Sequence, residues 1–161
     1  IVACDPTSST TCSTTKTTLA TIPDPIAPHF SFFGEVMVWT NPKAGSIHSC
    51  QVSSCAGSTT TLASGQLLSF PTPFTNSLAH YVVTDGANVY WTTNDGYVRH
   101  TLIAKPGAID VVSYSQPNPT ALALAGGQLY WSNVGGDLNA AGLATPPANF
   151  PSVVRITVAI P

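Results

Sequence analysis

Residues 85–102 read DGANVYWTTNDGYVRHTL and carry the clearest structural signals in the chain. Asp85-Gly86 is a strong signal for a tight hairpin turn between two strands. The β-branched and aromatic residues that follow predict a strand over 88–93. Asn94-Asp95-Gly96 turns the chain again, and 97–102 predicts the returning strand. The stretch therefore predicts antiparallel strands joined by short turns.

The centre of that stretch is a pattern that occurs three times. In each copy an apolar or aromatic residue is followed by Trp, then by a hydroxyl residue and, a few residues later, by Gly. All three Trp residues of the chain lie in this context, which is typical of an internal repeat of roughly 40–50 residues. Alternation along the middle strand places Val89 and Trp91 on one face and Tyr90 on the other. The copies are Val38-Trp39-Thr40…Gly45, Tyr90-Trp91-Thr92…Gly96 and Tyr130-Trp131-Ser132…Gly136.

Each copy lies in a run of short predicted strands separated by turns. With 14 Pro and 12 Gly, long helices would be interrupted, and no stretch shows a helical period. We therefore predict an all-β protein that forms a single domain over 1–161, made of about three propeller-blade-like antiparallel meanders. The units are expected at roughly 3–48, 49–100 and 101–140, followed by a terminal strand at 153–160. A β-trefoil, which is also built from three such units, is the alternative fold.

The three Trp residues have two possible roles. An equivalent residue in every repeat usually does an equivalent structural job, so we expect Trp39, Trp91 and Trp131 to form the repeat core. The alternative is that they are exposed platforms on which sugar rings stack. Solvent exposure of the indole rings distinguishes the two roles.

The four cysteines all lie in the first third of the chain, with Cys4 close to Cys12 and Cys50 close to Cys55. An even number of locally paired cysteines predicts disulfides in a secreted protein. A zinc site is the alternative, but the separation of Cys4 and Cys12 fits poorly with the tighter pairs that zinc prefers. Cys12 and Cys55 are each followed at the same interval by Thr-Thr-Leu-Ala, so they are in register with the repeat. We expect disulfides and no metal.

The composition excludes several classes of partner. The 161 residues are 43% hydrophobic and only 7% charged, against the roughly 25% charged residues of ordinary proteins, and the net charge is −2. Without a basic or acidic run, nucleic acids and anionic membranes are poor candidates. No uncharged apolar run approaches the ~20 residues of a membrane helix. Little electrostatic repulsion keeps copies apart, so self-association is expected.

The polar surface is rich in Ser and Thr, which together with the cysteines is typical of extracellular β-proteins. The chain begins at Ile1 rather than Met, and we expect a secretory segment to have been removed. We therefore expect a secreted or extracellular protein, or one in the periplasm or at the cell surface.

At residues 85–98 the chain resembles the blade repeat of YWTD-like β-propellers. The segment 50–66 resembles a Cys-containing blade connector of secreted propeller-repeat proteins found in myxobacteria and related bacteria. The resemblance covers roughly 3–145 and implies a propeller-type fold with no specific function, since propellers are mostly scaffolds for binding. The acidic fourth position of the family motif is absent, so a role for that carboxylate does not carry over. Its place is taken by Asn41, Thr93 and Asn133.

Three units are fewer than the four to eight blades of closed propellers, and open sheet edges favour assembly. The terminal stretch Val153–Ile160 alternates in a way that gives one fully apolar face. We expect this strand to pair with an open edge of a second copy or of a larger propeller partner. The residues of the expected assembly strand are Val154, Ile156, Val158 and Ile160.

The titratable residues point to no chemistry. The His residues lack metal-ligand spacing, Glu35 is the sole Glu, and most Asp residues lie at predicted turns. No nucleophile elbow, phosphate loop or dinucleotide motif is present, so we predict no catalytic residue, no cofactor and no enzyme activity. The His residues are His29, His48, His80 and His100.

The sequence therefore predicts a secreted, non-enzymatic structural or interaction module that self-assembles or completes its β-architecture with a partner chain. One alternative is a lectin-like module that binds a glycan through exposed aromatic residues. Another is a processed fragment of a larger propeller protein.

Overall fold

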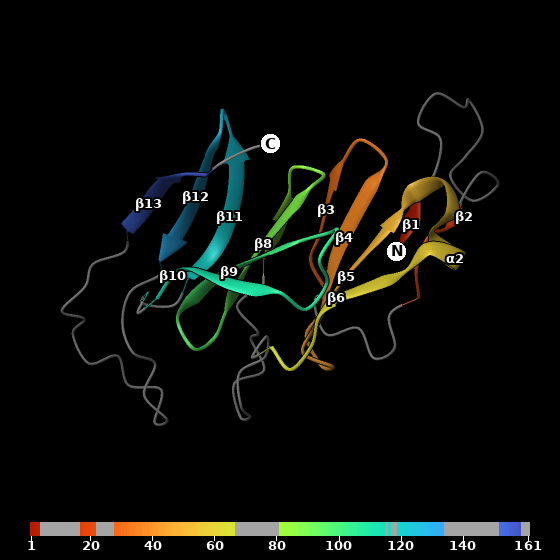
Figure 1. The fold of residues 1–161 in the computed structure, drawn as a ribbon, viewed down its shortest axis with the longest axis horizontal. Coiled ribbons are helices and arrows are strands. Elements are labelled where there is room, and N and C mark those ends of the chain that lie inside the picture. Colours follow the sequence, from red (N-terminus) through yellow and green to blue (C-terminus); the bar gives the residue numbers. More distant parts are fainter. Residues whose placement is uncertain are drawn as a thin grey trace.

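The computed structural model describes residues 1–3, 17–21, 28–66, 81–114, 116, 119–133 and 152–158 (Figure 1). The chain is all-β, as the sequence predicts, with three antiparallel sheets of three or four strands. Two further short strands, β1 (Val2–Ala3) and β2 (Thr17–Thr18), pair with each other.

The first sheet has the strand order β3-β4-β5-β6, so each strand pairs with its neighbour in the sequence. Its short helical connection between β5 and β6 consists of η1 (Val52–Ser54) and α2 (Cys55–Ser58). Among the described residues no helix is long and apolar enough to span a membrane. The strands are β3 (Phe30–Phe33), β4 (Val36–Asn41), β5 (Ser46–Gln51) and β6 (Thr60–Ala63).

The second sheet contains the stretch quoted first, and its two central strands have the predicted bounds. The hairpin before them forms because the Asp85 carboxylate accepts the backbone N–H groups of Ala87 (3.0 Å) and Asn88 (2.7 Å). Gly86 supplies the positive φ of +93° that the turn requires. The strands are β7 (Val82–Thr84), β8 (Asn88–Thr93), β9 (Tyr97–Leu102) and β10 (Ile109–Ser113), in the order β10-β9-β8-β7.

The third sheet has the order β11-β12-β13, from β11 (Pro119–Ala125), β12 (Gln128–Asn133) and β13 (Ser152–Thr157). The repeated Trp therefore lies in the second strand of each large sheet. The sequence units are out of phase with these sheets, since the boundaries after 48 and 100 fall inside β5 and β9. A repeat in the sequence fixes a period but not which strand begins a sheet.

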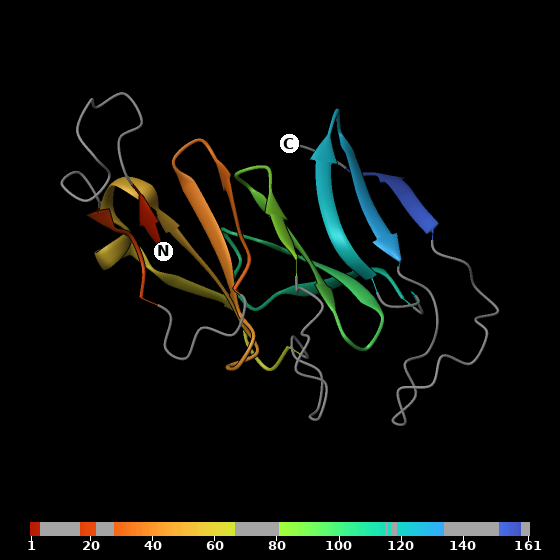
Figure 2. The same ribbon diagram turned by 180° about the vertical axis from the view of Figure 1, so that it is seen from behind.

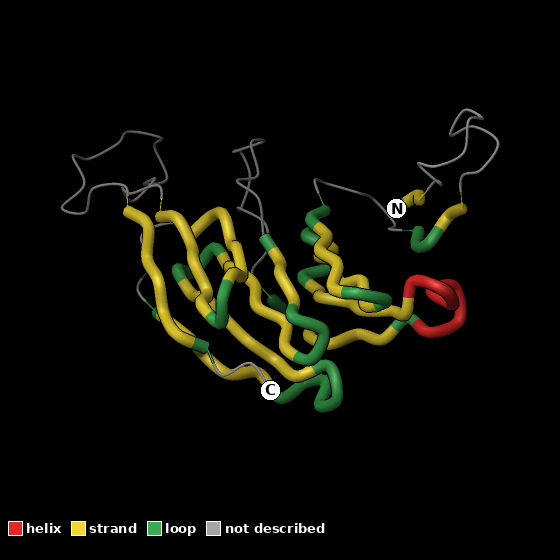
Figure 3. Tube along the Cα trace, turned by 90° about the horizontal axis from the view of Figure 1, so that it is seen from above, coloured by secondary structure: helices red, strands yellow, loops and turns green. Residues whose placement is uncertain are grey.

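The three sheets follow one another along the long axis in sequence order, with β1 and β2 at one end and β13 at the other (Figures 1 and 2). Seen from above, α2 lies at the end farthest from the third sheet (Figure 3). Neighbouring sheets bury apolar side chains between them. Val38, Ile47 and Leu62 of the first sheet meet Val82, Val89 and Trp91 of the second; Tyr90 and Val98 of the second meet Leu122, Leu129 and Trp131 of the third.

A separate cluster covers the opposite face of the first sheet. Met37, Trp39 and Cys50 pack there with Cys55 and with Leu19, which follows β2. The Ile1 amino group donates a hydrogen bond to the Ala20 carbonyl, and this bond fastens the N-terminus beside the cluster. The N-terminal strands therefore lie at the end of the molecule that carries Trp39.

Candidate functional site

The repeated Trp motif has one orientation in all three sheets. Trp91 faces the preceding sheet and Trp131 does the same, because each is buried in the interface on that side. The residue before Trp points the other way, so Val38 faces the second sheet and Tyr90 faces the third. By the same alternation Tyr130 faces away from the second sheet, where the described residues place no further sheet.

We call this surface the outer face of the third sheet. Its central row is Ala123, Tyr130 and Arg155, which lie opposite one another across β11, β12 and β13. Ala123 and Arg155 are exposed, and Tyr130 is half-buried. Since Leu122, Leu129 and Trp131 pack on the inner side, this row lies on the outer side. Further residues of the outer face are Ala125, Gln128, Ser132, Val153 and Thr157.

The outer face carries small, aromatic and uncharged polar side chains together with one cation, Arg155. Val153 is 76% exposed and projects next to Ser132, its register partner. Gln128 Nε2 donates to Thr157 Oγ1 at 3.0 Å, which ties the far row together. Arg155 is the one ionised side chain among the residues of this face. A surface of this kind can be covered by another β-sheet at little cost in charge desolvation.

The equivalent face of the second sheet shows how such a surface is covered. Tyr90 occupies the position of Tyr130 and is 3% exposed beneath the third sheet. His100 lies opposite Tyr90 and stacks on it, with 5.0 Å between ring centroids. Burial and the negative charge of Asp85 both raise the pKa of Tyr90, so its hydroxyl stays neutral. Arg155 stands opposite Tyr130 where His100 stands opposite Tyr90.

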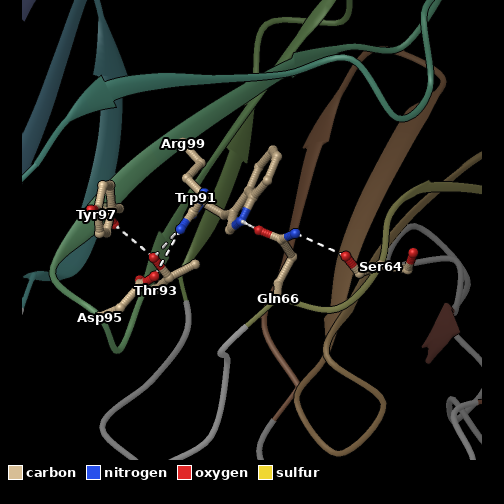
Figure 4. Close-up of polar contacts among 7 residues, drawn as sticks. All are labelled: Ser64, Gln66, Trp91, Thr93, Asp95, Tyr97 and Arg99. Atoms are coloured by element: carbon tan, nitrogen blue, oxygen red, sulfur yellow. Dashed lines mark hydrogen bonds and ion pairs between the residues drawn. The ribbon is translucent and has the colours of Figure 1, made fainter.

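A glutamine bridge joins the first sheet to the second (Figure 4). The Gln66 backbone N–H donates to the Gly45 carbonyl at 2.8 Å, and Gln66 Oε1 accepts the indole N–H of Trp91 at 3.3 Å. Gln66 Nε2 donates to the Ser64 carbonyl at 2.9 Å, which fixes the amide orientation. The linker therefore holds a turn of one sheet against the Trp of the next.

The same bridge recurs between the second and third sheets. The Gln116 backbone N–H donates to the Gly96 carbonyl at 2.9 Å, and its Oε1 accepts the Trp131 indole N–H at 3.0 Å. The same oxygen also accepts from Asn133 Nδ2 at 3.0 Å. The sequence analysis did not single out either Gln. The signal available was the near-equal spacing from the turn Gly to the Gln in the two units.

The turn that carries Gly96 is pinned by a charged side chain (Figure 4). Arg99 Nη2 lies 2.8 Å from Asp95 Oδ2, and its Nε donates to Thr93 Oγ1 at 3.4 Å. The guanidinium carbon lies 4.6 Å from the centre of the Tyr97 ring. These contacts stabilise the β8–β9 turn, whose Gly96 carbonyl accepts the hydrogen bond from Gln116.

All three repeated Trp residues are buried, with exposed fractions of 4% for Trp39, 0% for Trp91 and 1% for Trp131. Their rings lie inside the clusters described above, and two of the indole N–H groups are held by glutamine. The indoles therefore offer no exposed face for stacking on a sugar.

The cysteines are placed in part. Cys50 and Cys55 form a disulfide that closes the loop holding η1, and both residues are buried beside Trp39. Cys4 and Cys12 lie outside the described residues. The predicted local pairing is present for the second pair.

The terminal strand is placed in part. β13 pairs along its length with β12 and is the outermost strand of its sheet. The pairing of its other edge with a second copy stays a prediction. Val154, Ile156 and Val158 pack against the core between the second and third sheets. Pairing with β12 of the same chain places this apolar face against the core. Ile160 lies outside the described residues.

The histidines form no common site. His48 stacks on Trp39 with its Nε2 2.8 Å from Ser46 Oγ, and burial lowers the pKa of its imidazole. The His29 ring lies 4.2 Å from the Tyr81 ring centroid, tilted by 36°, and burial lowers the pKa of His29 as well. His80 lies outside the described residues. Within the described ranges there is no group of three or more His, Cys, Asp or Glu side chains suited to hold a metal ion.

No known family model matches this sequence, and no curated protein is similar to it. Function is therefore argued from the surfaces of the molecule itself. The outer face of the third sheet is the surface on which the repeat predicts a contact that the described chain does not supply.

Proposed function

We propose that the chain is a secreted, non-enzymatic interaction module in which the outer face of the third sheet binds the N-terminal end of a second copy. The observation that carries the proposal is the constant orientation of the motif. The residue before Trp is covered by the next sheet at Val38 and at Tyr90, and Tyr130 presents the same position to an occupant outside the described chain.

The N-terminal end suits this occupant in shape and in chemistry. A hollow of about 340 Å³ lies between Thr17–Leu19 and the segment from Val52 to Gly57. Hydroxyl, small and aliphatic side chains line it, and none of the described residues around it is charged. Tyr130 and the exposed Val153 of one copy would project into the hollow of another. The proposed contact is mostly uncharged on both sides.

Contact between opposite ends is heterologous, so it adds copies in one direction and ends in a ring or a filament. A ring of blade-like sheets is the propeller that the resemblance to YWTD-like repeats implies. A β-trefoil, which closes as a monomer, is the alternative arrangement. The Cys50–Cys55 disulfide supports an oxidising compartment for such an assembly.

Light scattering coupled to size exclusion tests the proposal. We expect the native chain to form an assembly whose mass is a multiple of 16.7 kDa. Ala123→Arg places a long cation in the central row of the outer face and should release single chains at the same concentration. Ala104→Arg adds the same charge at an exposed turn after β9 and should leave the assembly intact.

A monomer of the unmodified chain at all concentrations would contradict the proposal. Equal masses for the Ala123→Arg and Ala104→Arg variants would contradict it as well, because the outer face would then play no part. A native mass well above 16.7 kDa for a single chain would instead favour a processed fragment of a larger propeller protein.

A further inference from the structure

The first strands of the three sheets meet at an open cavity of about 310 Å³. Ser31, Phe32 and Phe33 of β3 line one side of it. The other sides come from Val83, Thr84 and Asp85 at the end of β7 and from Leu124, Ala125 and Gly126 at the end of β11. The volume lies at the lower end of the range for small-molecule sites.

Phe32 and Phe33 both line this cavity, but as neighbours in β3 their side chains point to opposite faces of the first sheet. Phe33 lies opposite Val36 and faces the second sheet, whereas Phe32 lies opposite Met37 on the face that carries Trp39. Phe32 is 45% exposed and Phe33 is 56% exposed, although both are large apolar side chains.

Phe33 is held in place across the sheet boundary, because its ring lies against Gly86. A Cβ at Gly86 would lie 2.7 Å from Phe33 Cδ1, so only glycine permits this approach. The rings of Phe30 and Phe32 form an edge-to-face contact, with 5.6 Å between ring centroids.

The cavity carries one charge, which is negative. Asp85 is the one ionisable residue among those that line it. Its carboxylate is positioned by the N–H groups of Ala87 and Asn88 and by Asn88 Nδ2, which donates to Oδ2 at 2.9 Å. The Thr84 hydroxyl is already used, since it donates to the Asn88 carbonyl at 2.7 Å and accepts the Gly86 N–H at 3.0 Å. The lining therefore combines the exposed ring of Phe33 with a fixed carboxylate.

We propose that this cavity binds a small organic cation, an ammonium group that carries an apolar body. Aromatic faces attract cations through the ring quadrupole, and a carboxylate adds Coulomb attraction. An anion would be repelled by Asp85. A sugar would find few free hydrogen-bonding groups, because Asp85 and Thr84 are occupied by the turn. Of the residues that line the cavity, Ala125 also lies on the outer face of the third sheet, opposite Gln128, so ligand binding is measured apart from assembly.

Isothermal titration calorimetry with benzyltrimethylammonium and with choline tests the proposal, with 3,3-dimethylbutan-1-ol as the uncharged isostere of choline. Both cations should bind, and the isostere should bind at least roughly fivefold more weakly than choline. The titration is repeated on the Ala123→Arg variant, so that assembly and ligand binding are measured independently.

Two variants locate the binding. Asp85→Asn keeps an oxygen that accepts the turn N–H groups but removes the charge, and it should raise the Kd of the cations roughly three- to tenfold. Phe33→Leu should raise the Kd by a similar factor. Asp110→Asn removes a carboxylate that is 81% exposed on β10 and should leave the Kd unchanged.

Equal binding of choline and its isostere would overturn the proposal, because the cavity would then be merely apolar. Absence of binding to the native chain would overturn it too. Where Asp85→Asn fails to give the native fluorescence spectrum, Phe33→Leu alone decides, since its ring is largely exposed and contributes little to the core.

Discussion

Gly96 and Gly107 form a matched pair that tests the inter-sheet bridge. Both have nearly the same backbone conformation, with φ of +80° and +83°. They differ in their surroundings: a Cβ at Gly96 would lie 2.8 Å from the Gln116 carbonyl oxygen, whereas a Cβ at Gly107 would meet nothing within 4 Å. Alanine therefore imposes the same backbone strain at both positions, but it creates a steric overlap only at Gly96.

The expected magnitudes follow from these distances. The left-handed backbone costs alanine about 1–2 kcal/mol at either position, partly offset by the lower entropy of the unfolded chain. At Gly96 the Gln116 backbone must also move away, which breaks its 2.9 Å hydrogen bond to the Gly96 carbonyl. That loss is about 1 kcal/mol, and a buried Trp131 indole N–H left without its partner adds about 1–3 kcal/mol. Gly96→Ala should therefore cost about 2–4 kcal/mol more than Gly107→Ala.

Urea unfolding followed by tryptophan fluorescence measures the free energy of unfolding of the two variants. The reasoning holds if Gly96→Ala is the less stable by the margin above. Equal stabilities within about 0.5 kcal/mol would refute it, because the close approach of Gln116 would then contribute nothing.

Three further predictions concern the bridge, the buried histidines and the disulfide. Gln116→Ala should lower the free energy of unfolding by about 2–4 kcal/mol by leaving buried donors unpaired. Gln128→Ala removes a solvent-exposed hydrogen bond to Thr157 from a half-buried side chain and should lower it by less than about 0.5 kcal/mol, both measured in urea. Because burial lowers the pKa of His48 below its ordinary 6.5, its protonation favours the unfolded state. Stability should fall as the pH drops from about 7.5 to about 5, and His48→Gln should reduce that fall; an unchanged pH profile would count against this cause. Replacing Cys50 and Cys55 together by alanine should cost about 2 kcal/mol, the entropy of so short a closed loop, and a loss near zero in the same urea assay would contradict it.

The local features of the fold were predictable from the sequence. The strands 88–93 and 97–102 were found at those bounds because alternation, β-branched residues and turn residues all act within a few positions. The opposite faces of Trp91 and Tyr90 follow from the same alternation. The strand Ile109–Ser113 was not predicted, because the short run IDVVS has two adjacent valines and no strict alternation, although turn residues flank it on both sides.

Long-range pairing was harder to predict. The alternation of Val153–Ile160 shows an apolar face, but it does not show which strand of its own chain it joins. In the structure that strand is β12, and pairing of the other edge of β13 with a second copy stays a prediction. Gln66 and Gln116 lie 25 and 15 residues before the Trp residues that they bind. Because this spacing differs, the Trp repeat alone could not identify them. Their role depends on how two sheets meet, which no local pattern contains.

A photo-crosslink from position 130 tests the central claim most directly. Tyr130 is replaced by p-benzoylphenylalanine, the protein is irradiated in solution, and the crosslinked peptides are identified by mass spectrometry. We predict a dimer in which position 130 is joined to the segment 17–21 or 50–58 of a second copy. Irradiation that yields no dimer, or a dimer joined at other segments, would contradict the proposed contact between the outer face of the third sheet and the N-terminal end.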